Sequence, residues 1–257
     1  MKHGDFTGLA DDYARFRPDY APAALRAILG IIGKLVTEID AVDVGAGTGI
    51  WTRMVADSGV RSMKAVEPND DMRGQGAADQ TNKNIVWKKG SGEDTGLDSG
   101  SADLLSMASS FHWVDFDKGI AEFTRVLRPG GCFVALWNPR FIEANPLLVE
   151  IEAHLATIKG GEIKRVSSGN SEFTETLAER LEECGQFDEV VYLESKHVIP
   201  FTSERYIGAW RSVNDLRVQL GAEKFNQFLM WVENRIADQS LIEATYLTRA
   251  WVARKSI

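Results

Sequence analysis

Cysteine is scarce in this sequence. Only Cys132 and Cys184 occur among 257 residues, and they are far apart in the chain. Zinc sites and disulfide frameworks need clusters of cysteine, or of cysteine and histidine, at short spacing. We therefore predict no metal site and no disulfide, and we expect both thiols to be kept reduced.

Long hydrophobic runs are also missing. No uninterrupted apolar run approaches the ~20 residues that cross a bilayer as a helix. The first ten residues carry no apolar core of the kind found in a signal peptide. We expect no membrane partner and a cytoplasmic location.

An excess of basic residues is the third absence. Aspartate and glutamate number 37 against 29 lysines and arginines, which gives a formal net charge of −8. Nucleic-acid binding depends on a basic surface that neutralises phosphates. The charge therefore predicts no nucleic-acid partner and favours a small-molecule substrate.

Strand and helix patterns alternate regularly through the first half of the chain. We predict short apolar strands at 41–44, 63–66, 84–87, 102–108 and 132–137, and helices at 23–32, 50–58, 72–79 and 116–127. Short apolar strands that alternate with helices are typical of a parallel sheet covered on both faces.

The second half is less regular. The patterns predict helices at 145–158, 171–183, 203–219 and 222–237, and strands at 188–198 and 244–253. The fold class predicted is α/β: a Rossmann-like, mostly parallel seven-stranded sheet with helices on both faces and an antiparallel last strand. Two helical insertions, 139–170 and 201–239, are expected to form a cap.

This pattern predicts one domain over 1–257. Its parts would be a cofactor-binding half at 1–138, the two insertions, and the remainder of the sheet at 171–200 and 240–257. Ligands of open α/β sheets bind at the carboxyl ends of the strands. Insertions after late strands would roof such a pocket, or would only bury sheet surface.

A glycine cluster follows the first predicted strand. Asp43 precedes Gly45, Ala46, Gly47 and Gly49, and a helix follows at once. Glycine permits a tight turn and a close approach of the backbone to a ligand. The spacing is G-x-G-x-G and not the dinucleotide pattern G-x-G-x-x-G. It favours a ligand without a phosphate and argues against a nicotinamide-dependent oxidoreductase.

Further polar segments follow the next strands in order. Glu67 and Pro68 end the second strand, about 20 residues after the glycines, where an acidic group can accept both hydroxyls of a ribose. Met72 follows one turn later. The segments 91–93 and 109–113 follow the third and fourth strands. Each has a structural alternative: Glu67 could be a surface carboxylate, Met72 a core residue and Glu93 a helix or turn cap. Together, in this order after successive strands, they predict a cofactor site.

These segments resemble the class I S-adenosylmethionine-dependent methyltransferases. The resemblance runs from Phe6 to Trp137, half the chain, and rests on the segments 42–49, 66–68, 111–113 and 125–131. An opening element with Tyr13, Arg17, Pro18, Tyr20 and Pro22 is similar to one subgroup, which includes the trans-aconitate methyltransferases.

The resemblance implies roles for individual residues. The glycines would flank the methionine part of S-adenosylmethionine, Glu67 would hold the ribose, and Met72 would pack on the adenine. Tyr13 and Arg17 would belong to a lid, with Arg17 beside the cofactor carboxylate. Relatives often carry alanine where this chain has Gly92. The full set predicted to bind the cofactor is Tyr13, Arg17, Asp43, Gly45, Ala46, Gly47, Gly49, Glu67, Pro68, Met72, Ser91, Gly92, Glu93, Ser109 and Phe111.

The acceptor site is less well defined. His112 is predicted as a general base, because its ordinary pKa lies near ~6.5; the alternative is a structural Phe-His-Trp turn. The residues predicted to bind the acceptor are His112, Trp113, Trp137, Arg140, Trp210 and Arg211. The alternative is that the tryptophans belong to the core and the arginines to the solvated surface.

The predicted function is methyl transfer from S-adenosylmethionine to a small-molecule oxygen nucleophile, a carboxylate or a hydroxyl, with S-adenosylhomocysteine as the product. The alternatives are a non-catalytic module that binds the same cofactor, and methyl transfer to nitrogen or carbon. The chain is expected to act as a monomer or a homodimer.

Overall fold

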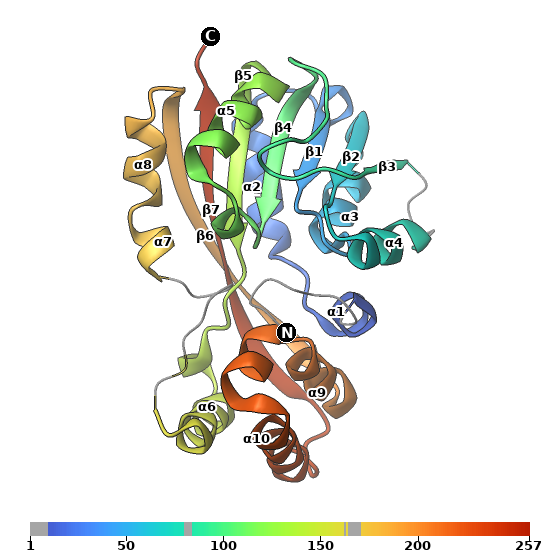
Figure 1. The fold of residues 1–257 in the computed structure, drawn as a ribbon, viewed down its shortest axis with the longest axis vertical. Coiled ribbons are helices and arrows are strands. Elements are labelled where there is room, and N and C mark those ends of the chain that lie inside the picture. The colour runs from blue at the N-terminus through green and yellow to red at the C-terminus, as the bar shows by residue number, and fades with distance from the viewer. Residues whose placement is uncertain (1–9, 80–83, 162, 164–170) are drawn as a thin grey trace.

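The structure is a computed structural model that describes residues 10–79, 84–161, 163 and 171–257. A seven-stranded sheet in the order β3-β2-β1-β4-β5-β7-β6 forms its centre (Figure 1). Its strands are β1 (Asp40–Val44), β2 (Ser62–Val66), β3 (Ile85–Lys88), β4 (Ala102–Ala108), β5 (Leu127–Trp137), β6 (Phe187–Phe201) and β7 (Ile242–Lys255). Strands β1 to β5 are parallel, and β7 is antiparallel to both of its neighbours. The predicted fold class is confirmed.

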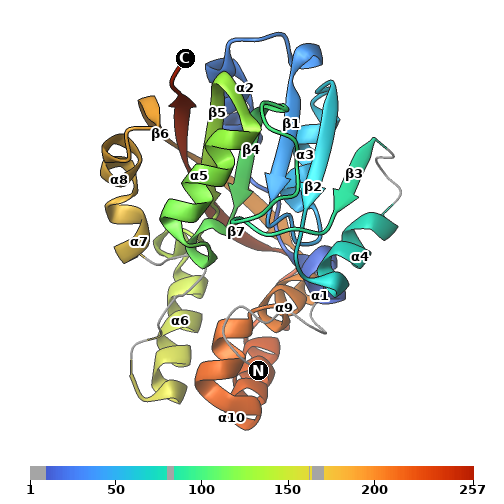
Figure 2. The ribbon, with the colours of Figure 1, turned by 45° about the horizontal axis from the view of Figure 1, so that its top comes forward.

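Helices cover both faces of the sheet (Figure 2). α2 (Pro22–Ile32) and α3 (Ile50–Asp57) bury their apolar sides against one face, and α5 (Phe116–Val126) and α8 (Leu177–Glu183) bury theirs against the other. Successive strand side chains point to opposite faces. Leu104 therefore belongs to the first core and Leu105 to the second.

The order of the strands defines where a ligand can bind. From β1 the chain passes through α3 to β2 and then β3 on one side, and it returns to place β4 on the other side of β1. The connections diverge at β1 and β4, and this leaves a crevice at their carboxyl ends. The glycine loop and residue Ser109 lie at those two strand ends.

A helical lobe lies beyond the carboxyl ends of the parallel strands (Figure 1). It consists of α6 (Pro146–Lys159), α9 (Ser203–Arg211), α10 (Asn214–Arg235) and the lobe ends of β6 and β7. A separate hydrophobic core holds it together, with Trp210, Phe228 and Phe201 fully buried. Within the first predicted insertion, residues 162 and 164–170 lie outside the described residues. The predicted role of the lobe as a substrate cap stays a prediction.

Several predicted boundaries were wrong. β5 begins at Leu127, because the chain after α5 pairs with β4 from Ala102 onward. The helix predicted over 171–183 is two helices, α7 (Ser171–Glu175) and α8. The helix predicted over 203–219 ends at Arg211, and α10 then continues across Gly221, whose φ of 74° and ψ of 167° are not helical.

The N-terminal helix α1 (Ala10–Phe16) joins the sheet domain to the lobe. It packs against α9, and its Phe16 ring lies directly over Gly208. A Cβ at Gly208 would lie 2.3 Å from that ring, so glycine is what allows the two helices to approach. Among the described residues, none of the helices has the length and apolarity needed to cross a membrane.

Candidate cofactor and acceptor site

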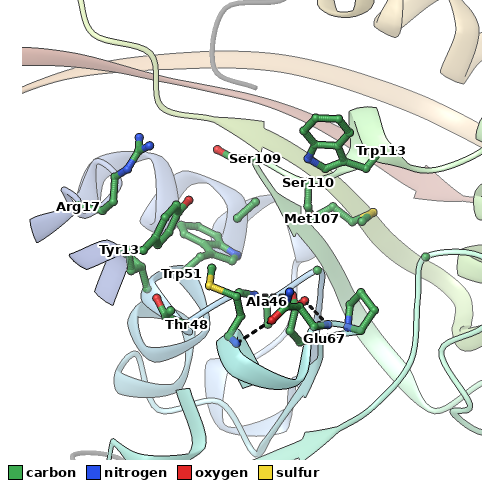
Figure 3. A pocket seen from close by; sticks show the side chains of 18 of the residues that line it. Tyr13, Arg17, Ala46, Thr48, Trp51, Glu67, Met107, Ser109, Ser110 and Trp113 are labelled. Atoms are coloured by element: carbon green, nitrogen blue, oxygen red, sulfur yellow. Dashed lines mark hydrogen bonds between the residues drawn. The ribbon is translucent and has the colours of Figure 1, made fainter. Parts of the chain in front are cut away.

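A cavity of about 290 Å³ opens at the carboxyl ends of β1, β2 and β4 (Figure 3). Tyr13 and Arg17 lie on one side of it, Trp113 lies on the other, and Glu67 lies at its floor. Twelve of the residues predicted to bind a cofactor line this cavity: Tyr13, Arg17, Gly45, Ala46, Gly47, Glu67, Pro68, Met72, Ser91, Gly92, Glu93 and Ser109. The structure brings them together from five separate segments, and their roles stay predictions.

The glycine loop is held against the end of β2. The backbone N–H groups of Gly45 and Ala46 both donate to the carbonyl of Val66, at 2.8 and 3.1 Å. Gly45 has a φ of 67°, and a Cβ there would lie 2.6 Å from the Cβ of Ser110. Only glycine fits this position, because the loop passes so close to the turn after β4.

Glu67 fixes the middle of the loop. Its Oε2 accepts the N–H of Gly47 and its Oε1 accepts the N–H of Asn69, both at 2.8 Å. Burial raises the pKa of this carboxyl, and the two backbone N–H groups oppose the rise. A carboxylate has about four acceptor sites, so each oxygen of Glu67 can accept a further hydrogen bond from a ligand hydroxyl.

Asp43 does not line the cavity. It is fully buried, and its two carboxylate oxygens accept the hydroxyls of Thr52 and Ser106, at 2.6 and 3.1 Å. Burial raises its pKa to about 7. The carboxyl therefore connects β1 to Thr52 of α3 and to Ser106 of β4.

Two further residues predicted to touch the cofactor, Gly49 and Phe111, also do not line the cavity. Gly49 is the residue before α3, with a φ of 86°. Phe111 is fully buried, and its ring packs against those of Phe123 and Phe133. The short turn over Phe111–Trp113 points its first side chain into the core and its third, Trp113, toward the cavity.

The far end of the cavity is formed by Met72 and the segment after β3. A Cβ at Gly92 would lie 2.4 Å from Cγ2 of Val114, which also lines the cavity. The space that an alanine would need is thus already filled by Val114. The Glu93 carboxylate accepts the N–H of Asp115 at 3.0 Å, which ties this segment to the start of α5.

The arm that follows α1 connects the cavity to the lobe. Arg17 donates from Nε to the hydroxyl of Ser212 at 2.7 Å and from Nη2 to its carbonyl at 3.3 Å. Its guanidinium carbon lies 4.9 Å from the centre of the Tyr13 ring. Arg17 is therefore held at the cavity wall by the end of α9.

Sequence reasoning missed several lining residues. Tyr20 forms a 2.9 Å hydroxyl hydrogen bond with Ser109, and its ring meets Trp51 edge-on at 5.3 Å between centres. Its role in the cavity could have been predicted from the sequence, because Tyr20 belongs to the same N-terminal element as Tyr13 and Arg17. The other lining residues outside the predicted set are Pro18, Thr48, Ile50, Trp51, Asn69, Met107, Ala108, Ser110, Val114, Asn138 and Tyr246.

His112 lies beside the cavity and does not line it. Its Nδ1 accepts the indole N–H of Trp137 at 3.3 Å, and burial lowers its pKa to about 4. The neutral ring therefore carries its proton on Nε2, and its one lone pair is occupied. This arrangement suits the structural alternative for His112 and not a general base. Trp137 itself is buried in the sheet core.

The residues predicted to bind an acceptor are only partly brought together. Arg140 and Trp210 line a second cavity of about 40 Å³, next to the first. Arg211 points elsewhere and forms a half-exposed ion pair with Glu233 at 3.1 Å. It follows Trp210 directly on α9, and adjacent helical side chains face different directions, so both could not reach the same cavity.

Comparisons with known proteins agree with this geometry. Residues 42–135 match the family model described as a methyltransferase domain. An uncharacterised methyltransferase of Mycobacterium tuberculosis is 37% identical over 130 residues, which cover 50% of this chain and 49% of the relative. One of Schizosaccharomyces pombe is 29% identical over 133 residues, which cover 50% of each chain. The chain thus spans about half the length of the curated relatives it matches.

Solved structures share the fold over nearly the whole chain. A candidate type II methyltransferase from Anaeromyxobacter dehalogenans is 22% identical, with a TM-score of 0.67, and the match covers 93% of this chain and 98% of that one. A Haemonchus contortus phosphoethanolamine N-methyltransferase in complex with S-adenosyl-L-methionine is 14% identical, with a TM-score of 0.55, and the match covers 98% and 58%. The fold is the Rossmann-like one of these methyltransferase structures.

Proposed function

We propose that this protein is an S-adenosylmethionine-dependent methyltransferase that acts on an oxygen nucleophile of a small molecule. One observation carries the proposal. Five segments that are separate in the sequence surround one cavity, with the Glu67 carboxylate at its floor and a glycine loop beside it. The named methyltransferases among the relatives and the shared fold support it.

The described residues fit this cofactor. Glu67 would accept the ribose hydroxyls, the glycine loop would lie along the methionine part, and Met72 would pack on the adenine. Arg17 and Tyr13 would lie over the cofactor carboxylate. The glycine loop offers backbone where a Cβ would clash, and the Glu67 oxygens have acceptor sites to spare.

When bound, the cofactor supplies a methyl group on a positively charged sulfur, and the nucleophile takes the methyl while the bond pair stays with the sulfur. The chain's own residues bind, orient and exclude water. Tyr20, Trp51 and Trp113 line the cavity with aromatic rings, which would exclude water from it. Orientation of two reactants in a closed site contributes up to ~7–11 kcal/mol to lowering a barrier.

The lining favours an acceptor oxygen that is already anionic. A neutral hydroxyl requires a general base, whereas a carboxylate does not. Of the two carboxylates of the cavity wall, Glu67 is assigned to the ribose hydroxyls and Glu93 accepts the N–H of Asp115, and His112 does not line the cavity. The resemblance to the trans-aconitate methyltransferases also supports an oxygen acceptor. Transfer to nitrogen or carbon, and a purely binding role, remain the alternatives.

We also propose a cytoplasmic location and no nucleic-acid partner. Two cysteines without a disulfide and the net charge of −8 support these statements. The chain would act as a monomer or a homodimer.

The test of this function is transfer of isotope-labelled methyl from S-adenosylmethionine to a library of small carboxylic acids, hydroxy acids, phenols and amines. We expect labelled product from oxygen acceptors, with one S-adenosylhomocysteine released per methyl transferred. Labelled product from amines alone would contradict the oxygen acceptor. Tight cofactor binding without transfer to any member of the library would favour the binding module.

A further inference from the structure

The second cavity lies between the cofactor cavity and the helical lobe. Arg17, Pro18, Asn138 and Tyr246 line both cavities, so the two are direct neighbours. Its volume of about 40 Å³ corresponds to a few water molecules, since one water needs roughly 10–15 Å³ measured in this way. A small polar group of the size of a carboxylate fits this space, and a ring system does not.

Arg140 is the central charged residue of this cavity. It follows β5, and its backbone forms an isolated bridge with Tyr246 of β7. Its side chain is only 15% exposed, and its guanidinium carbon lies 3.9 Å from the centre of the Trp210 ring. Stacking on an aromatic face orients the guanidinium plane and so aligns its donors.

Glu152 of α6 balances the charge of Arg140 from outside the cavity. Its Oε1 lies 3.4 Å from Nη2 of Arg140, and Glu152 is not among the residues that line the cavity, whereas Arg140 is. A guanidinium has five N–H donors, more than this contact can use. A buried charge with donors to spare favours a further anionic partner on the cavity side.

The other walls suit one negative charge. Tyr206 and Tyr246 are buried and contribute hydroxyl groups, while Arg17 contributes a second guanidinium. Asp215, at the start of α10, contributes a carboxylate to the same lining. Glu152 and Asp215 balance the charges of Arg140 and Arg17, so the groups around the cavity carry no net charge, which suits a monoanionic carboxylate better than a phosphate dianion.

We propose that this second cavity anchors a carboxylate of the methyl acceptor, with Arg140 as its bidentate partner, while the reacting oxygen of the acceptor lies in the neighbouring cofactor cavity. The inference rests on the proposed function, because it assigns the second cavity to the methyl acceptor and not to the carboxylate of the cofactor. It identifies the acceptor class as small organic acids in which an anchoring carboxylate and the reacting oxygen are separate groups.

The probe for this site is succinate, titrated calorimetrically into the full chain saturated with S-adenosylhomocysteine. Succinamide serves as the uncharged analogue of the same shape. The test variant is Arg140→Gln with Glu152→Gln, which removes both charges and leaves neither one buried alone. The matched control is Arg211→Gln with Glu233→Gln, an exposed ion pair of the same lobe.

We expect succinate to bind the wild type and the control equally, and to bind the test variant at least 10-fold more weakly. Succinamide should bind none of the three proteins measurably. Arg140→Lys keeps the charge but loses the planar guanidinium, so its affinity for succinate should lie between those of the wild type and the test variant. This single variant tests the role of Arg140 if the double variant fails to fold.

Two failures can be told apart. If S-adenosylhomocysteine binds the wild type but succinate does not, or if succinate binds the test variant and Arg140→Lys as well as it binds the wild type, the anchoring role of Arg140 is wrong and the proposed function stands. If S-adenosylhomocysteine does not bind a folded wild type, both the proposed function and this inference are wrong.

Discussion

Two buried carboxyls, one on each side of the glycine loop, couple the stability of the protein to pH. Asp43 lies behind the loop and Glu67 in front of it, and burial raises the pKa of both. A carboxyl with a raised folded-state pKa contributes stability at low pH, and this contribution is lost as pH rises through that pKa. For Asp43 the window runs from its ordinary pKa near 4 to about 7.

Asp43→Asn should remove this pH dependence. Asparagine can still accept the Thr52 hydroxyl, but it does not ionise. Between pH 4 and pH 8 the free energy of unfolding of the wild type should fall relative to the variant by on the order of 3 kcal/mol. Urea unfolding at both pH values measures this difference. Parallel pH curves for the two proteins would contradict the protonation assigned to Asp43.

His112 gives a second prediction at the residue scale. Its single lone pair accepts the Trp137 indole N–H, so we assign it a structural role. His112→Asn can preserve that hydrogen bond through its amide oxygen. We expect turnover to stay within about 10-fold of the wild type and the free energy of unfolding to fall by about 1 kcal/mol. A general base contributes about 100-fold or more to the rate. If turnover falls by that much while the affinity for S-adenosylhomocysteine is unchanged, His112 acts as the general base and the structural role is wrong.

At the scale of elements, the segment after β3 and the start of α5 depend on each other. Gly92 leaves no room for a Cβ because Val114 fills the space. Gly92→Ala should lower the melting temperature and weaken S-adenosylhomocysteine binding, because the segment or the Val114 side chain, both of which line the cavity, must move to make room for the added Cβ.

Val114→Ala should rescue this defect. The double variant Gly92→Ala with Val114→Ala adds a Cβ at position 92 and removes the γ-methyl groups of Val114 that would clash with it, so we expect a favourable coupling of about 1 kcal/mol in a double-mutant cycle. Additive effects of the two substitutions on both melting temperature and affinity would show that the two residues do not compete for the same space.

Much of the sheet could be predicted at this scale from local patterns. The strands 41–44 and 102–108 are short, apolar and bounded by turn residues, and the structure confirms them to within one residue. The extent of β6 and β7 could not be predicted, because their lobe ends are defined by pairing with each other and not by local preference. The break at Ser212 and Val213 has no glycine or proline to mark it.

At the scale of the whole molecule, some residues that line the cavity belong to motifs that can be recognised in the sequence, and others do not. Gly47, Glu67 and Met72 follow strand ends in order, so a motif connects them. Tyr246 and Asn138 reach the cavity from the last strand and the end of β5, and only the tertiary structure brings them there. Asp43 shows the reverse case, since it belongs to the motif but lies behind the cavity.

The lobe and the sheet domain meet at this cavity through residues of the N-terminal arm. Arg17 is held by Ser212 of the lobe, while Thr248 of β7 accepts the N–H of Ala21 at 2.8 Å and donates to Asn138 at the same distance. These contacts connect the N-terminal arm to both parts of the molecule. The arm therefore lies where it would cover a bound cofactor.

Cofactor binding in the Glu67 cavity is measured most directly by calorimetric titration of the purified chain with S-adenosylhomocysteine, repeated with Glu67→Ala and with the exposed control Glu182→Ala on α8. We expect micromolar binding at one site per chain for the wild type and the control, and binding weakened about 100-fold in Glu67→Ala, since hydrogen bonds to a charged group contribute roughly 1.5–3 kcal/mol each. If a folded wild type does not bind, or if Glu67→Ala binds as tightly as the control, the cofactor site is not at Glu67.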